Sequence, residues 1–287
     1  MSHQPRETTA AGGLPPDLFD TVTLLSLALV IVLLSTAYGL SLKLMPSKSG
    51  VSNTLRWLFI WHAFDALIHF VFEGSFLYHC FFSSASVYDL VFGGGRRSGA
   101  ENTGPVWGML ETHYGWFPDP TGFMNWAQGA QERYHGAQIG SISQDTSLGG
   151  KIAHAFAQLW MVYARADRRW AGIDLGVVSL ELLTVFIGGP LACWVCWDIV
   201  RKNPRANVLM IMLATAELYG GWMTFCPEWL TGSVNLDTSN FMYKWCYLVF
   251  FNGLWVVLPI WAIYVAAGEI MDAFRVKEEV VRGKKGN

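Results

Sequence analysis

Charged residues are scarce in this chain of 287 residues. They make up 15% of the sequence, whereas soluble domains typically carry about 25%. Hydrophobic residues account for 52%, and the mean hydropathy is +0.30. The formal net charge of −2 gives no sign of a nucleic-acid partner. This composition predicts a membrane protein that has the lipid bilayer as a partner.

Two features of secreted proteins are also missing. The five cysteines do not form a disulfide framework by number or by spacing. The first 17 residues are polar and contain Pro15 and Pro16. The apolar stretch that follows is longer than the apolar region of a signal peptide, which has about 7–15 residues. We therefore predict that residues 1–17 are an N-terminal tail and that a transmembrane helix follows them.

Five stretches are apolar over the length of about 20 residues that a helix needs to cross a membrane. They are Leu18–Leu42, Leu55–Phe82, Leu175–Val200, Val208–Phe225 and Tyr247–Ala267. We predict an all-α integral membrane protein, a bundle of five transmembrane helices. Helices 1 and 2 would occupy residues 18–82 and helices 3 to 5 residues 173–268, with a long insert at 83–172 between helices 2 and 3.

Basic residues in the connecting segments predict the orientation of the bundle. Residues 43–56 and 201–205 each contain three basic residues and no acidic residue, and the tail 269–287 contains five Lys and Arg. Because loops rich in Lys and Arg stay in the cytoplasm, the N-terminus and the insert would be lumenal and the tail cytosolic. The tail ends with Lys284 and Lys285 shortly before the C-terminus, which resembles an endoplasmic-reticulum retrieval signal. We predict a multi-pass protein of that membrane.

The insert at 83–172 is rich in glycine, polar residues and scattered aromatics. Its "GGGRRSG" at 93–99 lacks the strand, lysine and helix of a phosphate-binding loop. We expect an irregular cap with a short helix near residues 150–168. It would control access to a site in the bundle and take no part in the chemistry.

Ionisable side chains within the predicted spans are the most informative feature of the sequence. His62, Asp65, His69 and Glu73 follow one another in steps of three and four, which places them on one face of an α-helix. A charge at the bilayer centre costs at least about 2.5–3.5 kcal/mol. Such residues therefore usually face the bundle interior and have a function.

The other spans add further polar and aromatic side chains. They are Glu181 and Thr184 in the third span, Glu217 and Tyr219 in the fourth, and Asn252 and Trp255 in the fifth. Any one of them could be a contact between helices, and Asp65 could pair with His62. Gly220 and Gly221 could be a close helix contact. The whole set is too costly for contacts alone, which leaves a catalytic site, a metal site or a proton or cation pathway. Because the spans contain no H-x-x-x-H or H-E-x-x-H motif, we predict no metal.

Carboxyl groups in a dry site can act as acids and bases on an apolar substrate. Burial favours the neutral form of a carboxyl group, so one carboxyl can stay protonated and serve as an acid. A second, ionised carboxylate can stabilise a cation or take a proton back. The face of an indole attracts a desolvated cation by about 2 kcal/mol. This combination suits a carbocation that is made by protonating a double bond, and it requires no cofactor.

Four segments of the chain resemble the emopamil-binding protein family. They are "IHFVFEG" at 68–74, "LWMVYARADRRW" at 159–170, "SLELLTVFIGGPL" at 179–191 and "FFNGLWVVLP" at 250–259. The resemblance covers about residues 55–80 and 157–267. The family comprises the 3-beta-hydroxysteroid Δ8–Δ7 isomerases of the EXPERA superfamily, which are five-helix proteins of the endoplasmic reticulum. The resemblance implies a double-bond shift through a carbocation, which hydrophobic cationic amines imitate.

The resemblance also implies roles for residues at matching positions. His69 and Glu73 would transfer protons, and Glu181 would be the third catalytic residue, beside the cation. Hydrophobic amines would bind at Trp255 and Glu181. The expected substrate-binding residues are Thr184, Asn252, Trp255, Tyr219, Glu217, Asp65 and Tyr163.

The sequence departs from the family pattern at three places. Residues 217–221 read "ELYGG", where the family usually has Gln-x-Tyr-Gly-Asp. His62 and Asp65 are additions, and the insert is longer than in the animal isomerases. The leading prediction is a Δ8 to Δ7 sterol isomerase. The alternatives are an isomerase or protonation-initiated cyclase of another polycyclic terpenoid or meroterpenoid, and a sterol-binding or transport protein. A homodimer stays open.

Overall fold

The computed structural model describes residues 21–46, 48, 50–82, 148–171, 174–239 and 241–285. The described chain is helical, and five of its helices are long and apolar enough to cross a membrane, as the composition predicts. These spans are Thr21–Leu44, Asn53–Phe81, Leu175–Val200, Arg205–Leu230 and Met242–Lys284. The tail at 1–17 and the insert up to residue 147 lie outside the described residues.

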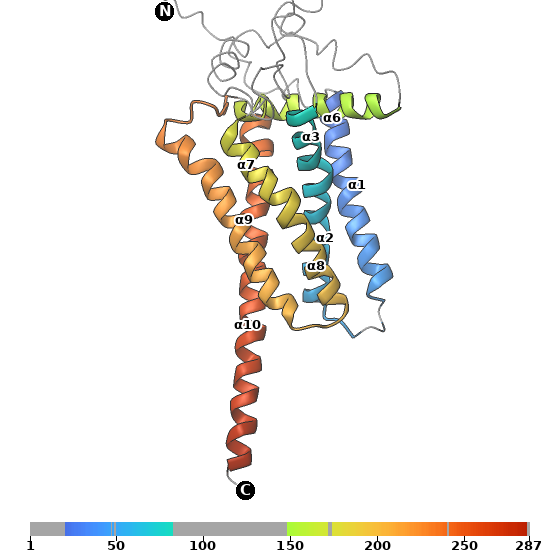
Figure 1. Cartoon of the computed structure of the whole chain (residues 1–287), viewed down its shortest axis with the longest axis vertical. Helices are drawn as coiled ribbons and strands as arrows, with labels where there is room; N and C mark the ends of the chain where they lie inside the picture. Colours follow the sequence, from blue (N-terminus) through green and yellow to red (C-terminus); the bar gives the residue numbers. More distant parts are fainter. Residues whose placement is uncertain are drawn as a thin grey trace, which may run out of the picture.

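The five spans run side by side along the long axis of the molecule (Figure 1). Three of them contain a π-helical segment beside their α-helical parts. In chain order the elements are α1 (Thr21–Leu44), α2 (Asn53–Ile68), η3 (His69–Glu73), α3 (Gly74–Phe82), α6 (Leu148–Ala164), η4 (Arg168–Ala171), α7 (Leu175–Leu183), η5 (Thr184–Gly188), α8 (Gly189–Val200), α9 (Arg205–Leu230), η6 (Met242–Phe251) and α10 (Asn252–Lys285).

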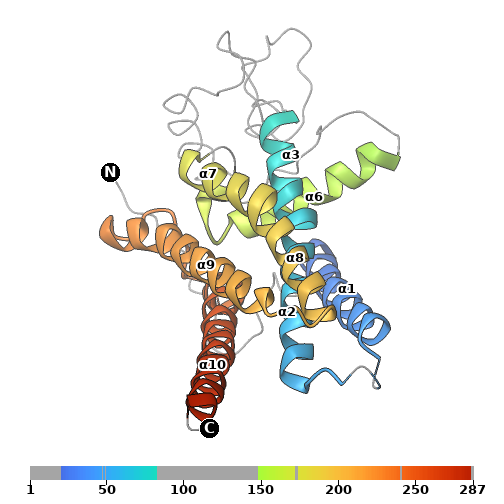
Figure 2. The ribbon, with the colours of Figure 1, turned by 60° about the horizontal axis from the view of Figure 1, so that its bottom comes forward.

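The second span is the centre of the bundle. In its most apolar stretch 61% of the residues are buried, against 17–28% in the other four spans. The α2 helix packs between α1 and α8 (Figure 2). Its residues from Leu58 to Ala66 are all buried. The polar face of this span is therefore covered by neighbouring helices, which is where a costly charge can be accommodated.

π-Helical turns occur next to the polar residues of the spans. His69 and Glu73 begin and end η3, Thr184 begins η5, and Asn252 follows directly after η6. A π-turn inserts an extra residue into a helix, and such turns occur frequently at functional sites. Here they change the direction of the side chains that follow them in three of the five spans.

Two glycines allow η5 to approach η3 closely. A Cβ atom at Gly189 would lie 2.9 Å from the ring of Phe70, and one at Gly188 would lie 3.4 Å from His69 Nε2. An alanine at Gly189 would push the Phe70 ring away, whereas one at Gly188 would touch His69 at ordinary contact distance. The interpretation of Gly220 and Gly221 as a close helix contact is wrong within the described part of the chain, because a Cβ at either position would meet none of its atoms within 4 Å.

The α6 helix lies across one end of the bundle, on top of α3 (Figure 1). It is the short helix that we expect near residues 150–168. Trp160 of α6 stacks on Trp170 at a centroid distance of 5.0 Å, and Phe76 of α3 packs against both rings. The indole Nε1 of Trp160 also donates to Ser75 Oγ at 2.9 Å. Aromatic packing thus joins α6 to the second span.

A polar cluster fastens the segment after α6 to α9. Asp167 forms an ion pair with Arg169 at 2.6 Å, and Arg169 Nη1 donates to the carbonyl of Thr224 at 2.6 Å. Burial raises the pKa of Asp167, and the ion pair with Arg169 opposes that shift. Glu228 accepts a hydrogen bond from Asn235 Nδ2 at 2.8 Å.

The last helix is longer than the sequence pattern indicates. We expected a span that ends at Ala267 and a tail at 269–287, but α10 continues as an exposed helix to Lys285. Residues 269–282 contain no glycine or proline to end it. Ion pairs of Arg275 with Asp272 at 3.2 Å and of Arg282 with Glu278 at 3.9 Å lie along this part, a spacing that supports helices. The fourth span is also longer than expected and covers Arg205–Leu230.

Candidate active site

His69 lies at the middle of a line of acidic groups on the second span. Its Nδ1 is 2.6 Å from Glu73 Oε2, and its Nε2 is 3.1 Å from Asp65 Oδ1. Both His69 and Asp65 are almost fully buried. A neutral imidazole donates from one nitrogen and accepts at the other. The ring can therefore pass a proton between the carboxyl groups on its two sides.

The third span adds a second acid on the Glu73 side of the ring. Glu181 of α7 is buried, and its carboxyl interacts with both Glu73 and His69. Thr184 Oγ1 lies 3.2 Å from Glu181 Oε2 and 3.1 Å from the Glu181 carbonyl. Two carboxyl groups side by side repel each other unless a proton lies between them. The Glu73–Glu181 pair is therefore suited to hold one transferable proton.

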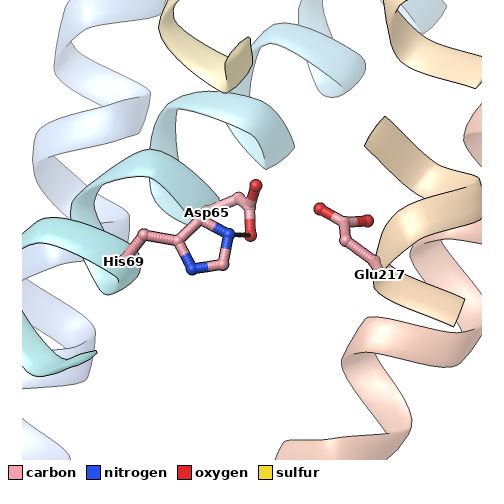
Figure 3. A group of neighbouring side chains, drawn as sticks. All are labelled: Asp65, His69 and Glu217. Carbon is pink, nitrogen blue, oxygen red and sulfur yellow. Dashed lines mark ion pairs between the residues drawn. The ribbon is translucent and has the colours of Figure 1, made fainter. Parts of the chain in front are cut away.

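The Asp65 side of the ring is built from the fourth and fifth spans. Trp255 of α10 donates from its Nε1 to Asp65 Oδ1 at 2.8 Å, and its ring packs on Trp61 at 5.4 Å. Glu217 points from α9 toward Asp65 and His69 (Figure 3). One ligand atom from each of Asp65, His69 and Glu217 lies within 4.8 Å of the others. A second pair of carboxyl groups thus faces the ring.

Several buried polar atoms of this second side find no hydrogen-bond partner within the described ranges. They are both carboxylate oxygens of Glu217, Asp65 Oδ2, both ring nitrogens of His62, and His69 Nε2, whose contact with Asp65 Oδ1 at 3.1 Å is an ion-pair contact and not a hydrogen bond. The pairing of His62 with Asp65 that the sequence left open is not formed. Asp65 instead uses Oδ1 for His69 and Trp255.

The end of the site near α6 is formed by Tyr163 and Asn252. Asn252 Nδ2 donates to the Tyr163 hydroxyl at 3.2 Å. It also contacts the carbonyls of Tyr247 and Leu248 at 2.9 and 3.0 Å, which belong to the π-helical turn before it. Burial raises the pKa of Tyr163, so its hydroxyl stays neutral. The contact ties α6 to the fifth span.

The structure joins most of the residues that the sequence proposes for the site. Seven of them form one connected network: Asp65, His69, Glu73, Glu181, Thr184, Glu217 and Trp255. Asn252 and Tyr163 form a separate pair. Tyr219 is 64% exposed on α9, so the structure does not bring it into this network. Its role in substrate binding stays a prediction.

Asp65, His69 and Glu217 are also residue types that can hold a divalent cation. A search for metal-binding motifs misses this group, because its members come from α2, η3 and α9. A cation at His69 Nε2 would have to displace Asp65, which is 3.1 Å from that atom. The present contacts therefore suit a proton better than a metal ion.

Comparison with known proteins identifies relatives of this chain. Residues 155–266 match the family model EBP, which is described as EXPERA (EXPanded EBP superfamily). The chain is 28% identical over 130 residues to the 3-beta-hydroxysteroid-Delta(8),Delta(7)-isomerase of Cavia porcellus, covering 45% of this chain and 57% of that protein. A probable isomerase of the same name in Arabidopsis thaliana is 32% identical over 103 residues, which are 36% and 45% of the two chains.

A synthase is a relative as well. Protoglabretal synthase of Ailanthus altissima is 27% identical over 133 residues, which cover 44% of this chain and 60% of that protein. The chain spans about half the length of the curated relatives that it matches. The matched family domain contains Glu181, Glu217 and Trp255, whereas His69 and Glu73 lie before it. Through residues 155–266, which contain three of its four motifs, the chain is similar to the EBP family of the EXPERA superfamily, as the resemblance predicts.

Proposed function

We propose that this chain is a membrane-embedded isomerase that shifts a ring double bond of a sterol from Δ8 to Δ7. The observation that carries the proposal is the contact of 2.6 Å between His69 and Glu73, with Glu181 beside it, in the centre of an apolar bundle. Relatives named as Δ8,Δ7-isomerases support this choice of reaction.

The Glu73–Glu181 pair supplies the acid in this reaction. Its O–H bond breaks, and the π electrons of the substrate double bond form a new C–H bond. A tertiary carbocation is left on the neighbouring carbon. A C–H bond on the other side of the cation then breaks, and its electron pair becomes the new double bond. The number of protons and electrons is unchanged, so the reaction requires no redox cofactor.

The surroundings of the acid pair protect and stabilise the cation. Water would capture a carbocation as an alcohol, and a buried site excludes water. Carboxylates at fixed positions stabilise positive charge as it develops, and the indole of Trp255 adds a cation–π attraction. Hydrophobic tertiary amines should bind for the same reason, because an ammonium group resembles the cation and transition-state mimics bind tightly.

We also propose an orientation in the endoplasmic-reticulum membrane. The basic segments at 43–56 and 201–205 lie at the end of the bundle from which α10 emerges, opposite α6 (Figure 1). This placement supports a cytosolic C-terminal helix and a lumenal insert. The insert would then control how a sterol enters from the membrane.

Expression in cells that lack the Δ8–Δ7 isomerase tests the proposed function. Sterol analysis should show restored Δ7 sterol with the natural chain and none with Glu73→Gln at the same protein level. Sterols that stay unchanged although the natural chain is well expressed would contradict the proposal.

A second candidate keeps the mechanism and changes the substrate to another polycyclic terpenoid, which the chain would isomerise or cyclise. The extra acidic groups Asp65 and Glu217 favour it, as does the similarity to protoglabretal synthase. Conversion of such a terpenoid, together with unchanged sterols in the same cells, would select this candidate. A sterol-binding or transport protein would instead bind sterols without converting any substrate.

A further inference from the structure

Asp65 and Glu217 are not used by the mechanism above. They lie on the opposite side of the His69 ring from Glu73, and they come from two different spans, α2 and α9 (Figure 3). The site thus contains two acidic pairs, one on each side of a single imidazole. A reaction that adds one proton and removes another has a use for two such pairs.

The contacts of other buried carboxylates show that the Asp65–Glu217 pair is not an ordinary structural one. Asp198 is held by Arg205 at 2.7 Å, Asp167 by Arg169 at 2.6 Å, and Glu228 by Asn235 at 2.8 Å. Glu217, in contrast, has both oxygens buried without a hydrogen-bond partner in the described chain, and Asp65 Oδ2 has none either. Leaving such a group unpaired is costly in a membrane interior. The unpartnered oxygens of Glu217 and Asp65 therefore indicate that their binding partner comes from outside the protein.

A proton is the partner that fits the contacts. Two carboxylates that face each other without a cation can share one proton. A pair that holds one proton still has a negative charge and can accept a second one. The unpartnered oxygens of Glu217 and Asp65 are the atoms at which that second proton would bind.

We propose that Asp65 and Glu217 form the base that removes the proton from the substrate cation, while Glu73 and Glu181 form the acid. This inference rests on the proposed isomerase function. In the step concerned, a C–H bond next to the cationic carbon breaks and its electron pair forms the new double bond. The proton binds to a carboxylate oxygen of the Asp65–Glu217 pair.

His69 connects the two pairs after each turnover. The base has then gained one proton and the acid has lost one. The ring contacts Asp65 through Nε2 and Glu73 through Nδ1. It therefore lies on the path by which a proton returns to the acid. Trp255 supports the base, because its Nε1–H donates to Asp65 Oδ1 and keeps that carboxyl directed at the ring.

Deuterium exchange in the reverse direction separates the two pairs. A Δ7 sterol carries one vinylic hydrogen, at C7, and the forward base acts there as the acid of the reverse reaction. In D2O, protonation places a deuteron at C7. Loss of the original C7 hydrogen from the cation then leaves deuterium in the recovered Δ7 sterol, whereas loss of the added deuteron returns the unlabelled sterol. The experiment uses the purified full-length chain in lipid nanodiscs with a Δ7 sterol, and mass spectrometry follows both the exchange and the conversion to Δ8 sterol.

Variants of the two pairs should lose different steps. Glu217→Gln and Asp65→Asn should lower exchange at C7 by about 10²-fold or more, the usual contribution of a general acid or base. Glu73→Gln should lose conversion to the Δ8 sterol and keep exchange at C7. Thr215→Val, an exposed change on α9 two residues before Glu217, serves as the matched control and should retain both.

Three results would overturn the inference. Exchange that survives in Glu217→Gln but disappears in Glu73→Gln would assign both proton steps to the Glu73–Glu181 pair. Activity that a chelator abolishes and Zn²⁺ or Mn²⁺ restores would make the group a metal site. A natural chain that neither converts nor exchanges Δ8 or Δ7 sterol would overturn the proposed function and this inference with it. If Glu217→Gln does not fold, Glu217→Asp tests the role of the carboxyl group instead. This variant retains a carboxyl and should keep measurable exchange at C7.

Discussion

Replacing Glu73 with glutamine separates proton transfer from the shape of the site. The amide has nearly the same size as the carboxyl, and its oxygen can still accept a hydrogen bond from His69 Nδ1, which now lies 2.6 Å from Glu73 Oε2. The ring should therefore keep its position. The amide cannot donate a carboxyl proton to the substrate. Turnover should fall while the binding of hydrophobic amines stays measurable.

The size of the loss follows from the role of the group. General acid–base catalysis typically contributes about 10²–10⁴-fold, which corresponds to about 2.7–5.4 kcal/mol in the activation free energy. His69→Ala should cost a comparable factor, because it removes the contacts to Glu73 and to Asp65 together. The double variant should be little slower than either single variant, since groups that act as a unit are not additive.

The assay is conversion of a Δ8 sterol by purified protein in detergent or nanodiscs, with amine binding and elution volume as checks on folding. Near-normal turnover in Glu73→Gln would refute the assignment. An activity loss that only follows the amount of folded protein would show that the contact between His69 and Glu73 is structural.

Three further predictions test the packing, the cation site and the insert. Gly189→Ala should lower the stability by about 1 kcal/mol, the small end of the range for overpacking, because its Cβ would lie 2.9 Å from the Phe70 ring but that ring is 45% exposed and can turn away. Gly221→Ala, which has open space around it among the described residues, should melt like the natural chain in detergent. Trp255→Ala should weaken amine binding by about 1–2 kcal/mol, and affinity indifferent to both Trp255→Ala and Glu181→Gln would remove the cation site from these residues. Replacing residues 84–147 with a short linker should change substrate range or turnover while the bundle still folds, and aggregation of this variant in detergent would instead show that the insert is structural.

The sequence alone determines which segments span the membrane and which of their residues can share a helix face. Both properties are local. About 20 apolar residues are needed to cross the bilayer, and residues four apart lie on one face whatever surrounds the helix. The contact of His69 with Glu73 is therefore predictable, and so are the five spans.

Only the tertiary structure decides which residues meet across helices. Asp65 binds His69 and Trp255 and leaves His62 unpaired among the described residues, because the fifth span presents an indole N–H at that height. The rotation of α9 turns Glu217 toward the ring and leaves Tyr219, two residues later, exposed.

The same limit applies to close contacts and to helix ends. The two Gly-Gly pairs within the spans read alike in the sequence, yet among the described residues only Gly188 and Gly189 of these lie against another helix. The π-turns at His69, Thr184 and Asn252 change the side-chain directions that an α-helical pattern assumes. Pairing between helices depends on how each helix is rotated about its own axis, and packing sets that rotation through contacts between residues far apart in the chain. The apolar pattern of a single span does not determine this rotation.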